Sequence, residues 1–259
     1  MSFPDPPPAS RAPERITLLT DFGTVDGYVG AMRGVIASIA PRAVVDDIGH
    51  DLPAGDIAAA AWSLVRYWNL YPEGTIHVVI VDPGVGTPRR AIAIEAYGRR
   101  IVAPDNGCAT LVLAEVPAAR TVAIENPAYL RHPVSRTFHG RDVFAPAAAH
   151  LANGAALDTF GSVIDDPVRL PLPAPRRNAG EINAAVVHVD RFGNLITNLS
   201  GEWAADIVEI EIEGRTIGPV RDTYGSVAPG EVVALVGSAG LIEVSIRNGD
   251  AASVLSAAR

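Results

Sequence analysis

In the N-terminal half, short runs of consecutive hydrophobic residues alternate with stretches in which hydrophobic residues recur at helical spacing. Short apolar runs at 16–20, 43–48 and 75–81 are typical of buried strands. Between these runs, two stretches repeat apolar side chains along one helix face: Val29, Met32, Ile36 and Ile39, then Ile57, Ala61, Leu64 and Trp68. Pro41 ends the first predicted helix, and Asp56 is placed to cap the start of the second. This alternation predicts an α/β fold with a mostly parallel sheet.

Beyond Asp82 the apolar runs become short and closely spaced. They predict three further strands, at 91–94, 100–103 and 121–124, and a third helix over 142–152, where Pro146 fits only the first turn. Four prolines between 167 and 175, followed by Gly180, mark a boundary. After it only strands are expected, without helical spacing, as in a small antiparallel barrel or sandwich; they lie at 184–189, 207–212, 232–236 and 241–246.

These patterns predict the domain organisation. We expect a disordered tail over 1–14, an α/β sandwich domain over 15–168, a linker over 169–180 and an antiparallel β-barrel domain over 181–259. The tail is rich in proline, which lacks an amide donor and favours extended chain. It has neither the basic start nor the apolar stretch of a signal peptide, and no apolar run reaches the roughly 18 residues of a membrane span.

Composition narrows the possible chemistry. All 21 basic residues are arginine, against 29 acidic residues and a net charge of −8. A chain without lysine cannot use a Walker lysine, a kinase lysine or a Schiff base. Without a basic patch, neither nucleic acid nor a membrane is an expected partner. Cys108 is the single cysteine, which excludes a disulfide within the chain and favours a cytoplasmic location.

Two aspartates follow strands at one edge of the predicted sheet. Asp21 follows the strand at 16–20 and Asp82 follows the strand at 75–81, and a glycine stands two residues after each. Open α/β sheets bind ligands beyond the C-terminal ends of their strands. Aspartate and glycine are also ordinary turn residues, but two such turns at one edge favour a ligand. The sequence Asp-Phe-Gly does not indicate a kinase, because the other kinase motifs are missing.

Arg89 and His139 are further candidates for chemistry. An arginine close to Asp82 would orient its carboxylate, although a solvated side chain on a hairpin fits the local sequence as well. His139 stands between a polar loop and a helix start and titrates near neutrality, so it suits acid–base catalysis or, equally, a structural role. His77, in an apolar strand, and His150, on a helix, are interpreted as structural. No histidine spacing indicates zinc, so no metal is expected.

Two turns of the second domain have two interpretations each. Asp190, Phe192 and Asn194 end a strand, where they either hydrogen-bond and stack on a flat polar ligand or only form the turn. Ser238, with Glu243 after it, is open to the same two interpretations.

Taken together, five motifs stand in a specific order. They are Leu-Thr-Asp-Phe-Gly (19–23), Val-Asp-Pro-Gly-Val-Gly-Thr (81–87) with Arg89, Phe-His-Gly-Arg-Asp (138–142), Asp-Arg-Phe-Gly-Asn (190–194) and Gly-Ser-Ala-Gly (237–240). This set resembles the S-adenosyl-L-methionine (SAM) hydrolase family, also called SAM hydroxide adenosyltransferases, which is related to fluorinating and chlorinating SAM enzymes. The resemblance spans residues 15–256.

The resemblance implies conversion of SAM and water into adenosine and L-methionine, without a cofactor. It implies a homotrimer whose site lies between the first domain of one subunit and the second domain of the next. The implied catalytic set is Asp82, Arg89 and His139. The implied substrate contacts are Asp21 (ribose), Asp82, Asp190 (methionine ammonium), Asn194 (adenine) and Ser238 (methionine carboxylate), with Phe192 and Glu243 as further wall contacts.

The chain departs from the halogenating relatives in two places. Between Ala91 and Gly107 there is no room for the long insertion of those enzymes. Pro53-Ala54-Gly55-Asp56 stands where the fluorinating enzymes carry an adenine-stacking tryptophan, so Tyr28 or Phe192 would have to stack instead. Both departures favour water or hydroxide over halide.

The residue types suit this chemistry. The sulfonium of SAM leaves as a neutral thioether, so catalysis consists of positioning and activating water, and positioning can supply about 7–11 kcal/mol. The hypothesis is that Asp82 and His139 hold the water and take its proton, while Arg89 stabilises the developing hydroxide and fixes Asp82. The alternatives are a non-catalytic SAM- or adenosine-binding protein, a SAM-dependent halogenase, and a metal-dependent phosphohydrolase that uses Asp21, Asp82 and His139. The preferred configuration at sulfur is left open.

Overall fold

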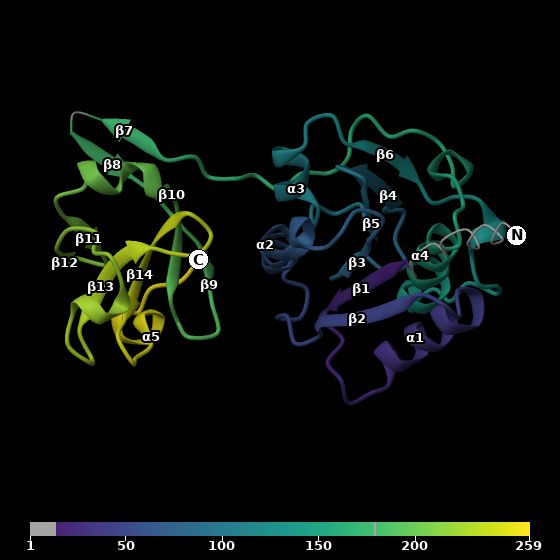
Figure 1. The fold of residues 1–259 in the computed structure, drawn as a ribbon, viewed down its shortest axis with the longest axis horizontal. Helices are drawn as coiled ribbons and strands as arrows, with labels where there is room; N and C mark the ends of the chain where they lie inside the picture. The colour runs from purple at the N-terminus through teal and green to yellow at the C-terminus, as the bar shows by residue number, and fades with distance from the viewer. Residues whose placement is uncertain (1–13, 179) are drawn as a thin grey trace, which may run out of the picture. The chain divides into compact units, whose positions relative to one another are not determined.

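The computed structural model describes residues 14–178 and 180–259, and these form two compact units (Figure 1). The first unit comprises the described residues up to Leu170, and the second extends from Pro171 to Arg259. Apart from Glu14, the expected N-terminal tail lies outside the described residues.

The first unit is built on a six-stranded sheet of described residues. Its order is β2 (Val44–Gly49), β1 (Arg15–Thr20), β3 (Ile76–Ile80), β5 (Arg99–Pro104), β4 (Ala91–Ala96) and β6 (Arg120–Ala123). The first four of these strands pair in parallel, whereas β4 is antiparallel to both of its neighbours. Every residue of β3 is buried, which explains its nearly unbroken apolar sequence. The predicted mostly parallel sheet is confirmed.

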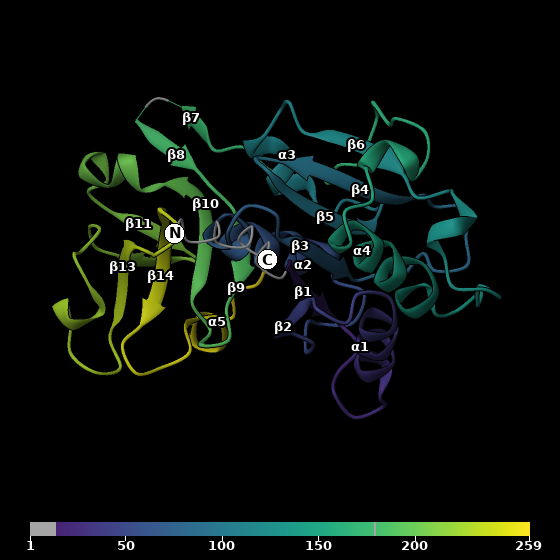
Figure 2. The same cartoon turned by 45° about the vertical axis from the view of Figure 1, so that its right-hand side comes forward.

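Helices cover both faces of this sheet (Figures 1 and 2). On one face, α1 (Tyr28–Ile39) and α4 (Ala145–Ala152) pack over Ile76 and Val78 of β3. On the other, α2 (Ile57–Tyr67) and α3 (Thr110–Glu115) pack over Val79. Alternate side chains of a strand point to opposite faces, so each face of β3 receives its own helix layer. The apolar spacing correctly predicted which side of α1 and α2 is buried.

The predicted helices need two corrections. Asp56 caps α2 as expected, accepting a hydrogen bond from the amide of Ala59 at 2.9 Å. The third helix, however, does not begin at 142: a π-helical segment, η3 (Gly140–Phe144), precedes α4, and Pro146 lies in the first turn of α4, where its missing amide is tolerated. The α3 helix was not predicted, because six residues are too few to show a helical period.

The second unit is antiparallel, as predicted. A four-stranded sheet has the order β13 (Val232–Val236), β14 (Leu241–Ile246), β10 (Leu195–Ser200) and β9 (Val186–Val189). Two hairpins pair β11 (Ile210–Ile212) with β12 (Arg215–Ile217) and β7 (Arg176–Asn178) with β8 (Glu181–Asn183). The expectation that this part contains no helix is wrong. The short α5 (Ala251–Leu255) follows β14, and Asp250 caps it by accepting from the amide of Ser253.

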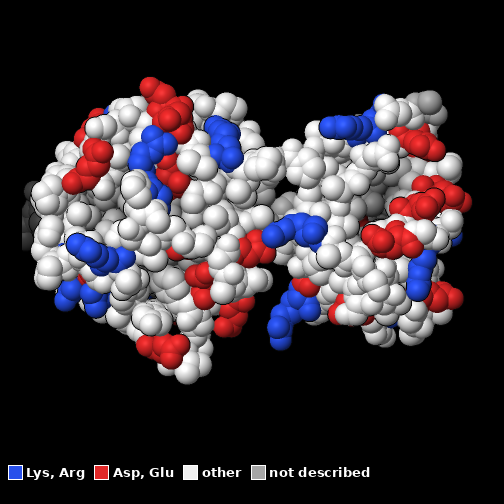
Figure 3. All heavy atoms as spheres, turned by 180° about the vertical axis from the view of Figure 1, so that it is seen from behind, with Lys and Arg blue, Asp and Glu red and all other residues white. Residues whose placement is uncertain are grey.

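Short 3₁₀-helical segments connect several of these elements. They are η1 (Trp68–Leu70), η2 (Pro127–Tyr129), η4 (Leu157–Thr159), η5 (Gly201–Asp206) and η6 (Tyr224–Ser226). Across the described chain, no helix combines the length and the apolar character that spanning a membrane requires. On the face shown in Figure 3, arginine and acidic side chains are interspersed, so this face carries no large basic patch.

Candidate functional site

The site begins where β1 and β3 end. Thr20 of β1 pairs with Ile80 of β3, so Asp21 and Asp82 leave two adjacent parallel strands at the same edge of the sheet. In the sheet, the chain that leaves β1 goes on to β2 on one side of this pair, whereas the chain that leaves β3 goes on to β4 on the other side. The connections therefore diverge between β1 and β3, which is the crevice where open α/β sheets bind ligands.

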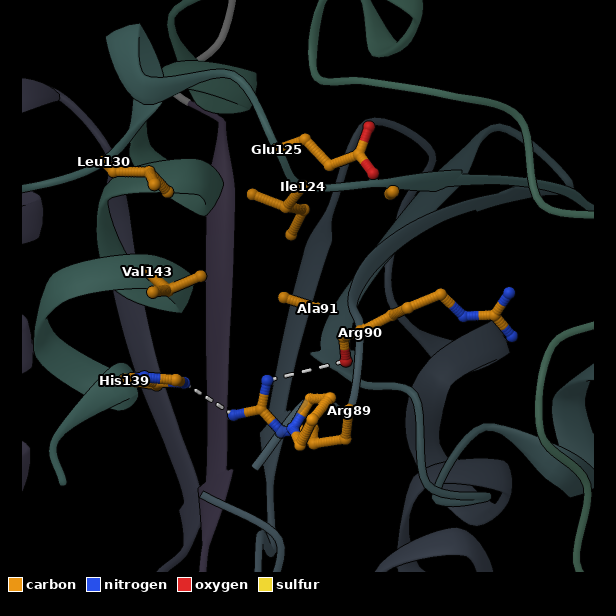
Figure 4. A pocket seen from close by; sticks show the side chains of 10 residues that line it. Arg89, Arg90, Ala91, Ile124, Glu125, Leu130, His139 and Val143 are labelled. Carbon is orange, nitrogen blue, oxygen red and sulfur yellow. Dashed lines mark hydrogen bonds between the residues drawn. The ribbon is translucent and has the colours of Figure 1, made fainter. Parts of the chain in front are cut away.

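Asp82, Arg89 and His139 are joined by hydrogen bonds. Nε of Arg89 lies 2.9 Å from Oδ1 and 3.1 Å from Oδ2 of Asp82, and Nη2 also donates to Oδ2. The same Nη2 lies 2.8 Å from Nδ1 of His139 (Figure 4). The side chains of Asp82 and Arg89 are only 5% and 10% exposed, so this two-pronged ion pair is shielded from water. The structure thus brings together three residues that the sequence singled out separately.

The contact with Arg89 determines the hydrogen-bonding role of His139. A guanidinium only donates, so Nδ1 accepts, and the neutral imidazole carries its proton on Nε2. Burial and the positive charge of Arg89 lower the pKa of His139 below its usual 6.5, outweighing the opposite effects of Asp82 and Asp142. His139 is therefore neutral at pH 7, and its Nε2–H group can donate a hydrogen bond.

A close approach of two loops brings Arg89 and His139 together. Gly86 has a φ of 80°, and a Cβ at this position would lie 2.8 Å from the carbonyl oxygen of Arg136. Only glycine allows the segment at 82–89 to pass so near the residues that precede His139. The glycine in this motif thus permits a contact between side chains fifty residues apart.

Asp142 anchors the segment that carries His139. Its buried carboxylate accepts hydrogen bonds from the amide of Ser135 at 2.9 Å, from Arg131 at 3.0 Å and from Nε of Arg141 at 2.7 Å. Burial by itself would raise the pKa of Asp142, but these hydrogen bonds lower it to about 2. No role for Asp142 was predicted from the sequence. Its place in the motif Phe-His-Gly-Arg-Asp was the available signal.

A hollow of about 240 Å³, here called the front hollow, borders both Asp82 and His139. Its lining also includes Thr137 and the rings of Phe22, Tyr28 and Phe138. These three rings meet edge to face, with centroids 5.0 to 6.1 Å apart. A carboxylate and an imidazole beside an aromatic wall can hold a small polar reactant next to an apolar or flat group. Phe22 and Phe138 were not predicted to contribute individually.

Asp21 lies at the same sheet edge with a different partner. Its Oδ2 accepts a hydrogen bond from the amide of Gly55 at 2.8 Å, just before α2 begins. The neighbouring Thr20 is held by His50, whose Nδ1 lies 2.9 Å from the threonine hydroxyl. The end of β1 is thus fixed from two sides, and the aspartate is half-buried.

Two histidines interpreted as structural have structural surroundings. His77 is fully buried, with Nδ1 2.9 Å from the hydroxyl of Thr17, and burial lowers its pKa to about 4, so the ring stays neutral. His150 packs on α4 with its ring centroid 5.1 Å from that of Tyr129.

Arg90 and Cys108 lie outside the hydrogen-bonded set. The guanidinium of Arg90 binds Asp105 and Asp166, each at 2.7 Å, and points away from His139 (Figure 4). Cys108 is fully buried, and burial raises the pKa of its thiol to about 12, which makes it a poor nucleophile.

In the second unit, Asp190 stabilises the turn that carries two other candidates. Its Oδ1 accepts from the amides of Phe192 and Asn194 at 2.8 and 2.9 Å, and its Oδ2 accepts from the side-chain amide of Asn194 at 2.9 Å. The ring of Phe192 is 75% exposed, whereas Asn194 is buried. The aspartate therefore shapes a turn that presents an exposed aromatic ring.

Glu243 supports the neighbouring turn from inside. It is 7% exposed, and its Oε1 accepts hydrogen bonds from the hydroxyls of Tyr224 and Ser245. Burial together with the contact to Glu243 raises the pKa of Tyr224 to about 12. A Cβ at Gly237 would overlap the Glu243 carboxylate, so the turn folds closely over it and leaves Ser238 exposed.

The chain is similar to known proteins over nearly its whole length. Models of the SAM hydroxide adenosyltransferase N-terminal and C-terminal domains match residues 16–161 and 184–259. A Thermus thermophilus protein named (R)-S-adenosyl-L-methionine hydrolase is 43% identical, with 93% of this chain and 94% of the relative covered. A solved structure of an uncharacterized conserved protein from Thermotoga maritima matches with a TM-score of 0.88 and 34% identity, covering 94% of this chain and 97% of that one. A fluorinase from an Actinoplanes species is more distant, at 28% identity over 71% of each chain.

Proposed function

Because the chain belongs to the SAM hydroxide adenosyltransferase family, we propose that its Asp82, Arg89 and His139 together activate the water that attacks SAM. The chain is an enzyme that hydrolyses SAM to adenosine and L-methionine. Relatives at about 40% identity are named as SAM hydrolases and the fluorinases are more distant, so the predicted function is confirmed.

The unbroken chain of hydrogen bonds from Asp82 through Arg89 to His139 is the observation that carries the proposed roles. A water in the front hollow donates one hydrogen bond to Asp82 and accepts one from Nε2–H of His139. This arrangement leaves a lone pair of the water free to face the ribose C5′, in line with the departing sulfur.

The reaction forms a bond between the water oxygen and C5′ and breaks the bond between C5′ and sulfur. The electron pair of the broken bond stays on sulfur as a neutral thioether, and one proton of the water is released. We assign this proton to Asp82, because Nδ1 of His139 is occupied by the donor from Arg89. This assignment narrows the hypothesis in which Asp82 and His139 both take the proton.

Arg89 contributes a permanent positive charge next to the attacking oxygen. The oxygen gains negative character as its proton moves to Asp82, and a fixed cation stabilises that charge without reorganising. The effect is stronger in a site shielded from water, and the Arg89 side chain is 10% exposed. The Asp82 carboxylate can accept a hydrogen bond and a proton from water, neither of which a halide ion can donate, and this favours hydrolysis over halogenation.

We propose substrate contacts from the residues of the motifs. Asp21 would bind the ribose, Asp190 the methionine ammonium, Asn194 the adenine and Ser238 the methionine carboxylate. Tyr28 lines the front hollow and Phe192 is exposed, so either ring is available for stacking. Glu243 stays a predicted wall contact, and its hydrogen bonds to Tyr224 and Ser245 would hold it in place beside the turn of Ser238.

We also propose that the enzyme is a homotrimer, as the family resemblance implies. Light scattering coupled to size-exclusion chromatography tests this, with three times the 27.1 kDa chain mass as the expected result. A monomer or dimer contradicts it. The cytoplasmic location stays a prediction.

The decisive experiment incubates the purified chain with SAM and measures adenosine and L-methionine by chromatography. We expect equal amounts of both products, and faster turnover of the (R)-sulfonium form, which the name of the Thermus thermophilus relative specifies. SAM that binds without being converted identifies a binding protein instead. A 5′-halonucleoside formed in the presence of chloride or fluoride identifies a halogenase.

A further inference from the structure

A second hollow lies behind the hydrogen bond between Arg89 and His139. This rear hollow has a volume of about 310 Å³, and both of these side chains line it. Its other walls are mostly apolar and come from the ends of β4 and β6 and from η3 (Figure 4). Glu125, whose side chain is exposed, belongs to the same lining, so the hollow reaches solvent.

His139 is the side chain that borders both hollows, among the described residues that line them. Asp82 lines the front hollow and Arg89 lines the rear one. The partition therefore includes polar side chains joined by hydrogen bonds, one of which links Nη2 of Arg89 to Nδ1 of His139 at 2.8 Å. Side chains move on much shorter timescales than the backbone of a packed sheet, so such a partition can open without unfolding.

The chemistry makes a second route useful. Each turnover consumes one water and releases one proton, while the nucleoside occupies the front hollow. A water molecule takes up about 30 Å³ in the liquid, so the rear hollow has room for several. The rear hollow contacts His139, which holds the reacting water, and Arg89, which is hydrogen-bonded to both His139 and Asp82.

We propose that the rear hollow is the water inlet and proton outlet of the hydrolytic site. The inference rests on the proposed function, since it concerns the water of that reaction. Water passes the Arg89–His139 pair to reach Asp82, and the proton accepted by Asp82 leaves on water along the same path. The route requires no reactant besides water.

Cysteine labelling can test the inlet, because the one natural cysteine is not expected to react with the reagent. Cys108 is fully buried and its thiol pKa is raised to about 12, so reagents do not reach or ionise it. Leu130→Cys introduces a thiol in the rear hollow and Thr137→Cys one in the front hollow. Val163→Cys, at a side chain that is 57% exposed, is the control. Each variant is treated with methyl methanethiosulfonate, with and without saturating adenosine.

We expect adenosine to protect the thiol of Thr137→Cys but not that of Leu130→Cys. Labelling Leu130→Cys should lower kcat at least about tenfold relative to the unlabelled variant, with an unchanged KM for SAM. Labelled Val163→Cys should keep its kcat. The inference is overturned if the thiol of Leu130→Cys does not react, is protected by adenosine, or reacts without loss of turnover.

A second variant tests the same point without a reagent. Leu130→Trp fills the rear hollow from a half-buried position, and we expect a lower kcat at unchanged KM. Wild-type turnover in this variant rejects the inlet. These results are separate from the function itself: a wild-type chain that releases no adenosine from SAM rejects hydrolysis, whereas an active enzyme insensitive to filling rejects the inlet alone.

Discussion

Arg89 donates from Nη2 to Nδ1 of His139 at 2.8 Å, and the same guanidinium binds both carboxylate oxygens of Asp82. Burial of the ring and the permanent cation beside it both disfavour the imidazolium form and lower the pKa of His139. One arginine thus orients the carboxylate and adds to the effect of burial that keeps the imidazole neutral. The guanidinium of Arg89 therefore positions both Asp82 and His139.

Removing this guanidinium should lower kcat strongly while adenosine binding is retained. In Arg89→Ala, Asp82 and His139 lose their shared partner, and we expect kcat to fall by roughly 10²- to 10⁴-fold, the range typical of lost acid–base positioning. The dissociation constant of adenosine, measured by calorimetry, should change little. Arg33→Ala removes an exposed ion pair with Asp47 and is the matched control, with wild-type kcat expected. Full turnover in Arg89→Ala rejects the proposed role.

The pH dependence of turnover should report the neutral imidazole. The pKa of His139 lies below 6.5, so the ring is neutral at higher pH and becomes charged only as the pH falls through that lowered value. A charged ring cannot accept from Arg89 at Nδ1, so we expect kcat to be level above pH 6.5 and to decline on the acid side. The measurement is adenosine formation at saturating SAM between mildly acidic and neutral pH.

Two results would contradict this interpretation. One is an acid limb centred above pH 6.5. The other is an unchanged profile in His139→Gln, which cannot titrate.

Asp142 should act as a positioning residue for His139. Its negative charge raises the pKa of His139, so in Asp142→Asn the acid limb of the kcat profile should move to lower pH. The hydrogen bonds to Ser135 and Arg131 also weaken, so kcat at neutral pH should fall. A purely structural role would lower stability without moving the limb. Asp158→Asn, at an exposed ion pair with Arg120, is the control and should leave the profile in place.

Chelation should leave the enzyme active. A sulfonium departs as a neutral thioether and needs no Lewis acid, and the proposed water ligands are the side chains of Asp82 and His139. We therefore expect the same rate of adenosine formation after dialysis against EDTA as before it. Loss of activity that returns with a divalent metal would favour the phosphohydrolase alternative.

Local patterns alone were enough to predict much of the architecture. Short apolar runs, a helical period of 3.6 residues and the positions of proline and glycine are properties of neighbouring residues, and they located β1, β3, α1 and α2. The rule for parallel sheets then put Asp21 and Asp82 at one edge. The short helices α3 and α5 were not predicted, because six and five residues are too few to show a helical period.

The contacts of the site, by contrast, depend on how distant segments pack. The bond from Arg89 to His139 exists because Gly86 lets one loop approach the carbonyl of Arg136, and Asp142 is an anchor because folding buries its carboxylate among donors. Hydrogen bonds act over about 3 Å, so they are set by the distance between loops in space. That distance is fixed only when the helices have packed on both faces of the sheet.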